Sequence, residues 1–314
     1  MILDILMLAA GLVLLVFAGD FLVKGAAGLA ENLGIPSLVI GLTIVAFGTS
    51  APELMVSLQS ALSGAADIAV GNVLGSNIAN VLLVMGLPAV IASIHADQRG
   101  LARNVAVMLV FTIAFMWMIS DDQLDRLEAG GLLAGLALFI LAQVARARAH
   151  VEEDEPADYH DELGEMPHAT GRIAMYLLGG LIGLPLAAHL TVSGASGLAE
   201  TFGISQAAIG LTIVAVGTSL PELATTMAAA WRKEADVALG NIIGSNIFNI
   251  GAIMGITGLI VPVPVSHIMI ERDMWIMLAT AVLLTAICYM RITTGRLLGA
   301  SMFAAYLAYI VVVF

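Results

Sequence analysis

The sequence predicts an all-α polytopic membrane protein with ten transmembrane helices, arranged as two inverted-topology repeats of five helices each. Three observations support this prediction. Of the 314 residues, 60% are hydrophobic and 11% are charged, whereas about a quarter of the residues of a soluble domain are charged. Apolar runs long enough to cross a bilayer follow one another along the whole chain. The two halves of the chain also carry the same long motif.

The apolar runs predict where the ten helices lie. Each run has about twenty residues, which matches the thickness of the hydrocarbon core of a bilayer. The first run lacks a basic start and a small-residue cleavage site, so we expect a retained transmembrane helix rather than a signal peptide. The expected helices lie near residues 3–23, 37–60, 68–91, 102–120, 126–147, 172–196, 206–230, 237–260, 270–290 and 294–314.

The two halves are related by a shift of 169 residues. Residues 39–86 align without a gap with residues 208–255, and 26 of the 48 positions are identical. Each half holds an odd number of expected helices, so the second half enters the membrane from the opposite side. Inverted repeats are typical of secondary transporters, whose binding sites lie near the bilayer midplane. We therefore divide the chain into a first repeat (1–149), a linker (150–171) and a second repeat (172–314).

The basic residues predict the orientation, because cytoplasmic loops are enriched in Lys and Arg. With the N-terminus outside, ten of the twelve Lys and Arg residues fall in cytoplasmic loops or at the cytoplasmic ends of helices. The other two, Arg126 and Arg272, fall outside. We therefore expect a multi-pass protein of the cell membrane, the inner membrane of a prokaryote, with both termini outside and the linker in the cytoplasm.

The linker is acidic and contains two prolines, which is typical of a solvated segment. It lacks the ordered ligand spacing of an EF-hand loop, although a cation-sensing role stays open for Glu152, Glu153, Asp154 and Glu155. The net charge of −12 offers no basic surface to nucleic acid. The single cysteine forms no intrachain disulfide, and the sequence indicates no obligate protein partner.

The repeated motif places a proline and a glutamate side by side within an apolar run, as "GTSAPE" at 48–53 and "GTSLPE" at 217–222. Proline lacks an amide hydrogen and distorts the helical turn before it. Hydrocarbon does not tolerate unsatisfied carbonyls unless they line a cavity or meet a ligand. The released carbonyls are therefore candidate cation ligands, and we expect them near Ala46, Phe47, Ala215 and Val216.

The two glutamates of the motif, Glu53 and Glu222, are the strongest functional candidates. A carboxylate at the centre of a bilayer is costly unless it is paired, and it usually marks a functional site. All twelve Lys and Arg residues lie at helix ends or in loops, so neither acid has a basic partner in the expected helices. Two unpaired acids predict a bound cation. Hydroxyl groups beside them come from Thr49, Ser50, Thr218 and Ser219.

The next expected helix of each half carries amides and hydroxyls. "GNVLGSNIAN" at 71–80 places Asn72, Ser76 and Asn80 on one helix face, and "GNIIGSNIFN" at 240–249 repeats this arrangement. Asn77 lies off this face, so we expect it to support the ligand residues or to pack between helices rather than to bind the ion. Carboxylates, amides, hydroxyls and carbonyls together suit Ca²⁺ or Na⁺. Alternatively, each neutral polar group only joins neighbouring helices, but that interpretation does not explain the glutamates.

At these motifs the sequence resembles the Ca²⁺/cation antiporter superfamily, and within it the sodium/calcium exchanger branch. The resemblance covers essentially the whole chain. It implies a Na⁺/Ca²⁺ antiporter rather than an enzyme, with the transported Ca²⁺ and Na⁺ as ligands and no cofactor. It implies that the first and sixth helices slide across the bundle, for which the glycines at 25, 28, 194 and 197 are suited. By motif position it implies a ligand set of Thr49, Ser50, Glu53, Ser76, Asn80, Thr218, Ser219, Glu222, Ser245, Asn249 and the carbonyls of Ala46 and Ala215.

Within the resemblance, the potassium-dependent exchangers carry an acid at the position of Asn249, so the asparagine argues against a requirement for K⁺. Other functions stay open. Exchange of Ca²⁺ for H⁺ would require Glu53 or Glu222 to bind a proton during the cycle. A passive cation channel would conduct without a counter-ion. An intramembrane enzyme is the weakest alternative, because no second polar group is placed for acid–base or nucleophilic chemistry.

Overall fold

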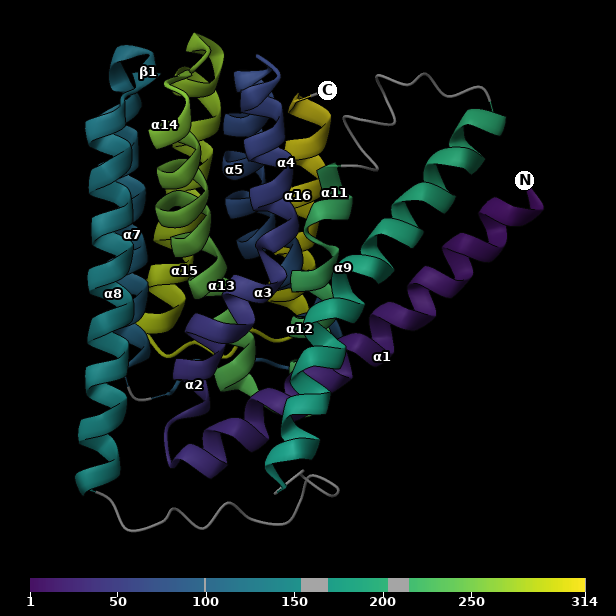
Figure 1. The fold of residues 1–314 in the computed structure, drawn as a ribbon, viewed down its shortest axis with the longest axis vertical. Coiled ribbons are helices and arrows are strands. Elements are labelled where there is room, and N and C mark those ends of the chain that lie inside the picture. The colour runs from purple at the N-terminus through teal and green to yellow at the C-terminus, as the bar shows by residue number, and fades with distance from the viewer. Residues whose placement is uncertain (99, 154–168, 203–214, 314) are drawn as a thin grey trace.

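The computed structural model describes residues 1–98, 100–153, 169–202 and 215–313. Nearly all of the described residues are helical (Figure 1). The elements of the first half are α1 (Ile2–Leu33), α2 (Ser37–Ile40), η1 (Gly41–Val45), α3 (Ala46–Thr49), α4 (Ala51–Leu62), α5 (Ala66–Ala79), η2 (Asn80–Val84), α6 (Gly86–Ile91), α7 (Leu101–Met118), η3 (Ile119–Asp121), β1 (Gln123–Leu124) and α8 (Arg126–Glu153).

The second half follows the same plan. Its elements are α9 (Thr170–Thr201), α11 (Ala215–Thr218), α12 (Leu220–Trp231), α13 (Ala235–Phe248), η5 (Asn249–Met254), α14 (Gly255–Ile260), β2 (Val263–Pro264), η6 (Met269–Asp273), α15 (Met274–Tyr289) and α16 (Arg296–Val313). The segments η1, η2, η5 and η6 are short π-helical stretches, and η3 is a 3₁₀ turn.

Eight helices of the described residues are long and apolar enough to cross a membrane. A ninth candidate is the bent pair Ser37–Thr49 and Ala51–Leu62, whose two parts meet at 44°. These nine agree in position with nine of the expected spans. The remaining span, expected at 206–230, begins outside the described residues. Residues 154–168 of the linker also lie outside them. The prediction of an all-helical polytopic membrane protein is therefore confirmed, and the count of ten stays a prediction.

Corresponding helices of the two halves run in opposite directions (Figure 1). α1 and the continuous pair α5–α6 run from the upper end of the view to the lower end, whereas α9 and α13–α14 run upward. Both termini lie toward the upper end, and α8 ends and α9 begins at the lower end. Short antiparallel pairings join loops of the two halves: Leu124 pairs with Val263 in β1–β2, and Ile94 pairs with Thr294.

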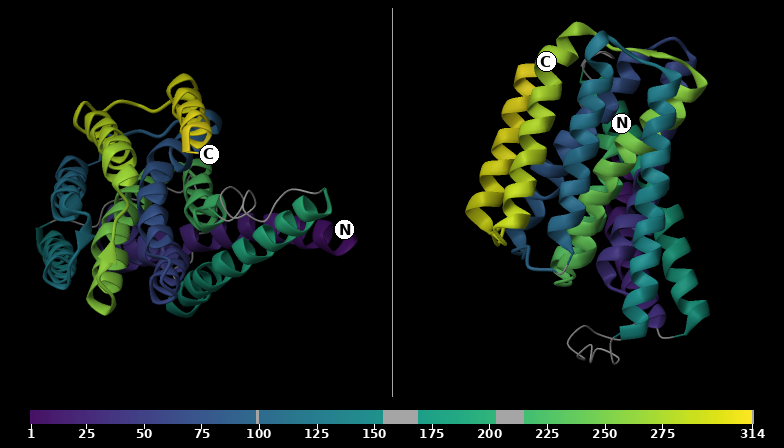
Figure 2. Two further views of the ribbon diagram at one scale, coloured as in Figure 1. Left: turned by 90° about the horizontal axis from the view of Figure 1, so that it is seen from above. Right: turned by 90° about the vertical axis from the view of Figure 1, so that its left-hand side faces the viewer.

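α1 and α9 have 32 residues each, pack along one another and stand beside the other helices (Figure 2, left). Glycines let the two backbones approach closely, as small residues do in membranes. A Cβ built on Gly25 would lie 2.7 Å from the amide nitrogen of Leu177, and one built on Gly180 would lie 2.5 Å from the Cβ of Leu22. The two helices therefore form one closely packed unit.

Both of these helices are longer than the apolar runs expected at 3–23 and 172–196. In α1 the charged residues that end the apolar run are paired. Lys24 Nζ lies 3.0 Å from Asp20 Oδ2, and Arg232, just after α12, also binds Asp20. The helix continues past these charged residues to Leu33, where Gly34 ends it with a left-handed conformation at φ 62°.

The buried apolar side chains form two clusters. The larger cluster joins α5 to α8 with α13 to α16. The smaller cluster joins α1 and α9 to parts of α12 and α13. The bent segment α2–η1–α3 contributes to both, with Leu42 and Ala46 in the larger cluster and Ile40 and Val45 in the smaller one. This segment therefore lies at the boundary between the α1–α9 pair and the remaining bundle.

Glycines of α13 hold this bent segment in place. A Cβ built on Gly240 would lie 2.9 Å from the Cα of Gly41, and one built on Gly244 would lie 2.6 Å from the Cβ of Ala46. The backbones of α13, η1 and α3 consequently touch. This contact brings the first "GTSxPE" motif against the second "GNxxGSN" motif, although 192 residues separate Thr49 from Asn241.

Candidate cation-binding site

Each "GTSxPE" motif forms a break between two helices. α3 ends and α4 begins at Ser50 (φ −83°, ψ 4°), and α11 ends and α12 begins at Ser219 (φ −88°, ψ 5°). The proline follows in the first turn of the new helix, where its missing amide would have no intrahelical partner in any case. The glutamate follows the proline in the same first turn. The positive end of the helix dipole stabilises a carboxylate at this position.

This geometry corrects one interpretation of the motif. The carbonyl of Ala46 is not released by Pro52, because it accepts the Ser50 amide at 3.0 Å and the Thr49 hydroxyl at 3.3 Å. The carbonyl of Val216 likewise accepts the Ser219 amide at 3.1 Å. The prolines begin new helices instead of interrupting continuous ones. For Ala46 and Ala215 the role of cation ligand stays a prediction, and the side chain of Ala215 is outside the described residues.

The two acids lie in the interior of the protein. Glu53 and Glu222 are each only 1% exposed. Ser50 Oγ donates a hydrogen bond of 3.0 Å to Glu222 Oε1, and this bond joins the break that carries Glu53 to the acid of the other half. The second oxygen, Oε2, of each glutamate has no hydrogen-bond partner among the described residues. Each buried acid therefore has an oxygen open to a ligand.

Asn72 and Asn241 fasten the acid-bearing helices in matching ways. The amide nitrogen of Asn72 donates to Ser57 Oγ at 2.9 Å and to the Glu53 carbonyl at 3.3 Å. The amide of Asn241 donates to Thr226 Oγ1 at 3.1 Å and to the Glu222 carbonyl at 3.3 Å. These bonds place each glutamate on a fixed backbone.

The same two asparagines also connect the halves. Asn241 Oδ1 accepts the Thr49 hydroxyl at 3.1 Å, and Asn72 Oδ1 accepts the Thr218 hydroxyl at 3.4 Å. Thr49 also lies 3.5 Å from the Ser245 hydroxyl. The network therefore brings the two motifs of each half together with the two motifs of the other half.

The remaining candidate ligands are also buried at this junction. Ser76 is 4% exposed and Ser245 is fully buried, while Asn80 and Asn249 are each 1% exposed. Asn80 and Asn249 begin the π-helical segments η2 and η5, and such segments are frequent at functional sites. Several of these polar atoms have no partner in the part of the chain that the structure describes: Asn80 Oδ1, both side-chain polar atoms of Asn249, and Ser219 Oγ.

Reasoning from the sequence missed two residues of this network, Ser57 and Thr226, which accept the asparagine amides. A signal for them was present. They occupy matching positions in the two repeats, 169 residues apart, and each lies one turn after a motif glutamate. Asn72 and Asn241 were placed on the correct helix face, but the structure gives them a supporting role through the backbone of Glu53 and Glu222.

The arrangement can hold a hard cation. Neither Glu53 nor Glu222 forms an ion pair with a described residue, and the described ranges hold no group of three or more His, Cys, Asp and Glu side chains that is arranged to bind a metal ion. The available ligands are two carboxylates with neutral amide and hydroxyl oxygens, which suit Ca²⁺ or Na⁺ rather than soft transition metals.

Comparisons with known proteins agree in sequence and in fold. The sequence matches the family described as "Sodium/calcium exchanger protein" over residues 3–145 and 173–314. It is 41% identical to the protein CaxA of Alkalimonas amylolytica, over 91% of this chain and 89% of that protein. It is 33% identical to the sodium/calcium exchanger MaX1 of Methanosarcina acetivorans, over 99% of this chain and 98% of that protein.

The fold is similar to a solved structure of the sodium-calcium exchanger NCX_Mj soaked with zero Na⁺ and Ca²⁺. The TM-score is 0.86 and the sequences are 31% identical, and the comparison covers 100% of this chain and 99% of that chain. The similarity therefore includes both halves of the chain and all segments that contribute to the site.

We predict that Ca²⁺ stabilises the detergent-solubilised protein against thermal unfolding, and that Glu53→Gln and Glu222→Gln each remove this effect. At a free Ca²⁺ concentration of about 100 times Kd, the stabilisation amounts to ~2.7 kcal/mol. In a chelator, both variants should unfold at a higher temperature than the wild type, because one buried charge is removed. Differential scanning fluorimetry measures both effects.

Glu271→Gln is the control, because Glu271 is 69% exposed and lies outside the site. It should retain the Ca²⁺ effect in full. An undiminished Ca²⁺ effect in both Glu53→Gln and Glu222→Gln would place the cation elsewhere.

Proposed function

Because the chain belongs to the sodium/calcium exchanger protein family, we propose that it is an antiporter that exchanges Na⁺ for Ca²⁺ by alternating access at the site between Glu53 and Glu222. One observation carries this proposal. The two carboxylates are buried, have no cationic partner among the described residues, and each has an oxygen without a hydrogen-bond partner there. The residues that bind the ion are those named from the motifs. The protein binds the transported Ca²⁺ and Na⁺ and needs no cofactor.

The charge of the site explains why transport is coupled. Two carboxylates neutralise one Ca²⁺ or two Na⁺, so either loaded site carries little net charge. An empty site with two negative charges is costly to move through a low-dielectric region. The protein therefore changes the side to which its site opens only when the site holds an ion. This requirement suppresses the uncoupled leak of ions in either direction.

We propose that the α1–α9 pair moves as a unit across the remaining bundle. The separate hydrophobic clusters support this movement, because one of them joins α1 and α9 to the bundle through few helices. Three of the glycines that were expected to ease sliding lie between α1 and α9 rather than between this pair and the bundle. Gly25 packs against α9, and Gly194 and Gly197 pack against residues 4–8 of α1, so they hold the moving helices to each other.

We also propose the complete topology of ten spans in two inverted repeats, with both termini outside and the linker at 150–171 in the cytoplasm. The opposite directions of α1 and α9, and the position of both termini toward one end, support it (Figure 1). The excess of basic residues near the opposite end supports the orientation. The proposed location is the inner membrane of a prokaryotic cell, without an obligate protein partner or nucleic acid.

Transport by purified protein tests the proposed exchange. In Na⁺-loaded proteoliposomes diluted into choline medium, we expect uptake of ⁴⁵Ca²⁺ that is absent when the outside medium contains equal Na⁺. Glu53→Gln and Glu222→Gln should each lower this uptake at least ~100-fold, because a neutral amide cannot replace a carboxylate in charge balance. Glu271→Gln should transport like the wild type.

The same assay separates the alternatives. Uptake that is indifferent to Na⁺ but collapses with a protonophore would replace the proposal with Ca²⁺/H⁺ exchange. Uptake that needs no counter-ion at all would indicate a channel. Either result would refute Na⁺/Ca²⁺ exchange.

Reporter fusions test the orientation. We expect alkaline phosphatase, which is active only outside the cytoplasm, to be active when fused after Val313 and inactive when inserted into the linker near residue 160. A fluorescent protein that matures in the cytoplasm should give the reverse pattern at the same two positions. Phosphatase activity in the linker would show that the orientation is wrong.

A further inference from the structure

The repeat symmetry predicts that each polar contact of the site occurs twice, once in each half. Some contacts do. The bonds that Asn72 makes to Ser57 and to the Glu53 carbonyl recur as the bonds of Asn241 to Thr226 and to the Glu222 carbonyl. The support of the acids is therefore symmetric in this structure.

Two other contacts occur only once. Ser50 donates to Glu222 at 3.0 Å, but the matching donor, Ser219 Oγ, has no partner among the described residues. The matching acceptor would be Glu53, whose Oε2 is also unpartnered there. The second-half serine thus lacks the bond that the first-half serine makes.

The asparagine that ends each "GNxxGSNxxN" motif shows the same asymmetry. Asn80 Nδ2 donates to Asn246 Oδ1 at 3.4 Å. The matching bond would run from Asn249 Nδ2 to Asn77 Oδ1, and both of these buried atoms are without a partner in the described chain. In both contacts the donor of the first repeat is satisfied and the donor of the second repeat is not.

The surroundings of Asn77 and Asn246 differ accordingly. Asn246 Nδ2 donates to Met108 Sδ at 3.5 Å, whereas Asn77 Nδ2 donates at 3.0 Å to the Val73 carbonyl of its own helix. Met277 stands 169 residues after Met108 and lines the same space as Asn77. A methionine partner is therefore present for Asn77 as well, and it is not used here.

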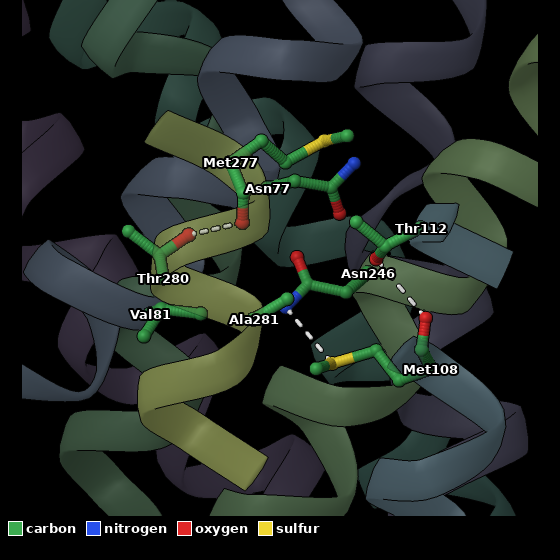
Figure 3. A pocket seen from close by; sticks show the side chains of 8 residues that line it. All are labelled: Asn77, Val81, Met108, Thr112, Asn246, Met277, Thr280 and Ala281. Carbon is green, nitrogen blue, oxygen red and sulfur yellow. Dashed lines mark hydrogen bonds between the residues drawn. The ribbon is translucent and has the colours of Figure 1, made fainter. Parts of the chain in front are cut away.

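Asn77 and Asn246 line the same small cavity, which has no room for a water molecule. Figure 3 shows that the amide oxygens of Asn77 and Asn246 both point into it. Its other walls are Val81, Met108, Thr112, Met277, Thr280 and Ala281. A turn of Asn77 in this cavity therefore requires its neighbours to move, and all of the lining side chains are neutral.

We propose that Asn246 and Asn77 are alternating positioning residues for the transport cycle. In the state seen here, Asn246 orients the ligand amide of Asn80. In the oppositely facing state, Asn77 turns to Met277 and accepts the amide of Asn249, while Ser219 donates to Glu53 and the bonds of Asn246 and Ser50 are released. This inference rests on the proposed function, because it assigns Asn80 and Asn249 to the transported ion.

The exchange of partners has a direct consequence for energy. Each state makes the same number of polar bonds with equivalent groups, so the two states differ little in free energy and both stay populated. A ligand amide that is held by a neighbour is pre-organised for the ion. In the state seen here the amide of Asn80 is therefore pre-organised for the ion, and in the opposite state the amide of Asn249 is.

Transport measured separately from the two faces of the membrane tests the proposal. Na⁺-driven ⁴⁵Ca²⁺ uptake is measured in right-side-out and in inside-out membrane vesicles, for the wild type, Asn246→Ala and Asn77→Ala. We expect Asn246→Ala to raise the half-saturating Ca²⁺ concentration about three- to tenfold at one face, as the loss of one hydrogen bond predicts. Asn77→Ala should raise it by a similar factor at the other face. At the unaffected face, each variant should show the wild-type value or a lower one.

Asn104→Ala is the matched control. Asn104 is a buried asparagine on α7 whose amide oxygen accepts a 2.6 Å bond from Gln143, a residue outside the repeated motifs. Its loss should act equally at both faces. If an alanine variant fails to fold, Asn246→Ser and Asn77→Ser retain a polar group in the cavity that is too short to reach the ligand amide, and they should show the same opposed pattern.

Equal effects of Asn246→Ala and Asn77→Ala at both faces, or effects at the same face, would overturn the alternation and leave the exchange function intact. Wild-type vesicles without Na⁺-driven uptake would instead refute the proposed function, and the alternation with it.

Discussion

The central constraint on this protein is the burial of two carboxylates, Glu53 and Glu222, in a membrane without a basic side chain beside them among the described residues. Such a pair is stable only if the local structure compensates the charges in part and a cation completes the compensation. The helix breaks supply the first part. Each acid stands in the first turn of a helix, at the positive end of its dipole, and an asparagine of the next helix binds its backbone carbonyl.

The same constraint explains why the helices around the site are divided. A continuous helix would present one side of the motif to the centre, whereas a break at Ser50 or Ser219 presents a hydroxyl and a carboxylate together. The glycines of α13 let the broken segment of the first half lie directly against it. The α1–α9 pair packs over this segment from the other side, at the boundary between the two hydrophobic clusters. Movement of that pair would thus act directly on the ion ligands.

Much of this could be predicted from the sequence, because the internal repeat carries unusually specific information. Polar residues at matching positions of two apolar halves indicated which side chains meet, and contacts between Thr49 and Asn241 and between Ser50 and Glu222 agree with that expectation. The state of the Ala46 carbonyl was predicted wrongly, because a proline pattern does not show whether the residue interrupts a helix or begins one. The length of α1 was underestimated, because Asp20 pairs not only with Lys24, one turn away, but also with Arg232, which lies far from it in the sequence. The asymmetry between Asn77 and Asn246 is also invisible in nearly identical motifs, since it belongs to one conformation.

The location of a bound divalent cation tests the central claim most directly. A structure of the wild-type protein determined with Sr²⁺ or Ca²⁺, with the ion identified by its anomalous scattering, would settle where it binds. The account predicts a single strong peak between Glu53 and Glu222, with carboxylate oxygens at about 2.3–2.6 Å for Ca²⁺. A peak elsewhere, with both carboxylates unliganded at a cation concentration that supports transport, would contradict it.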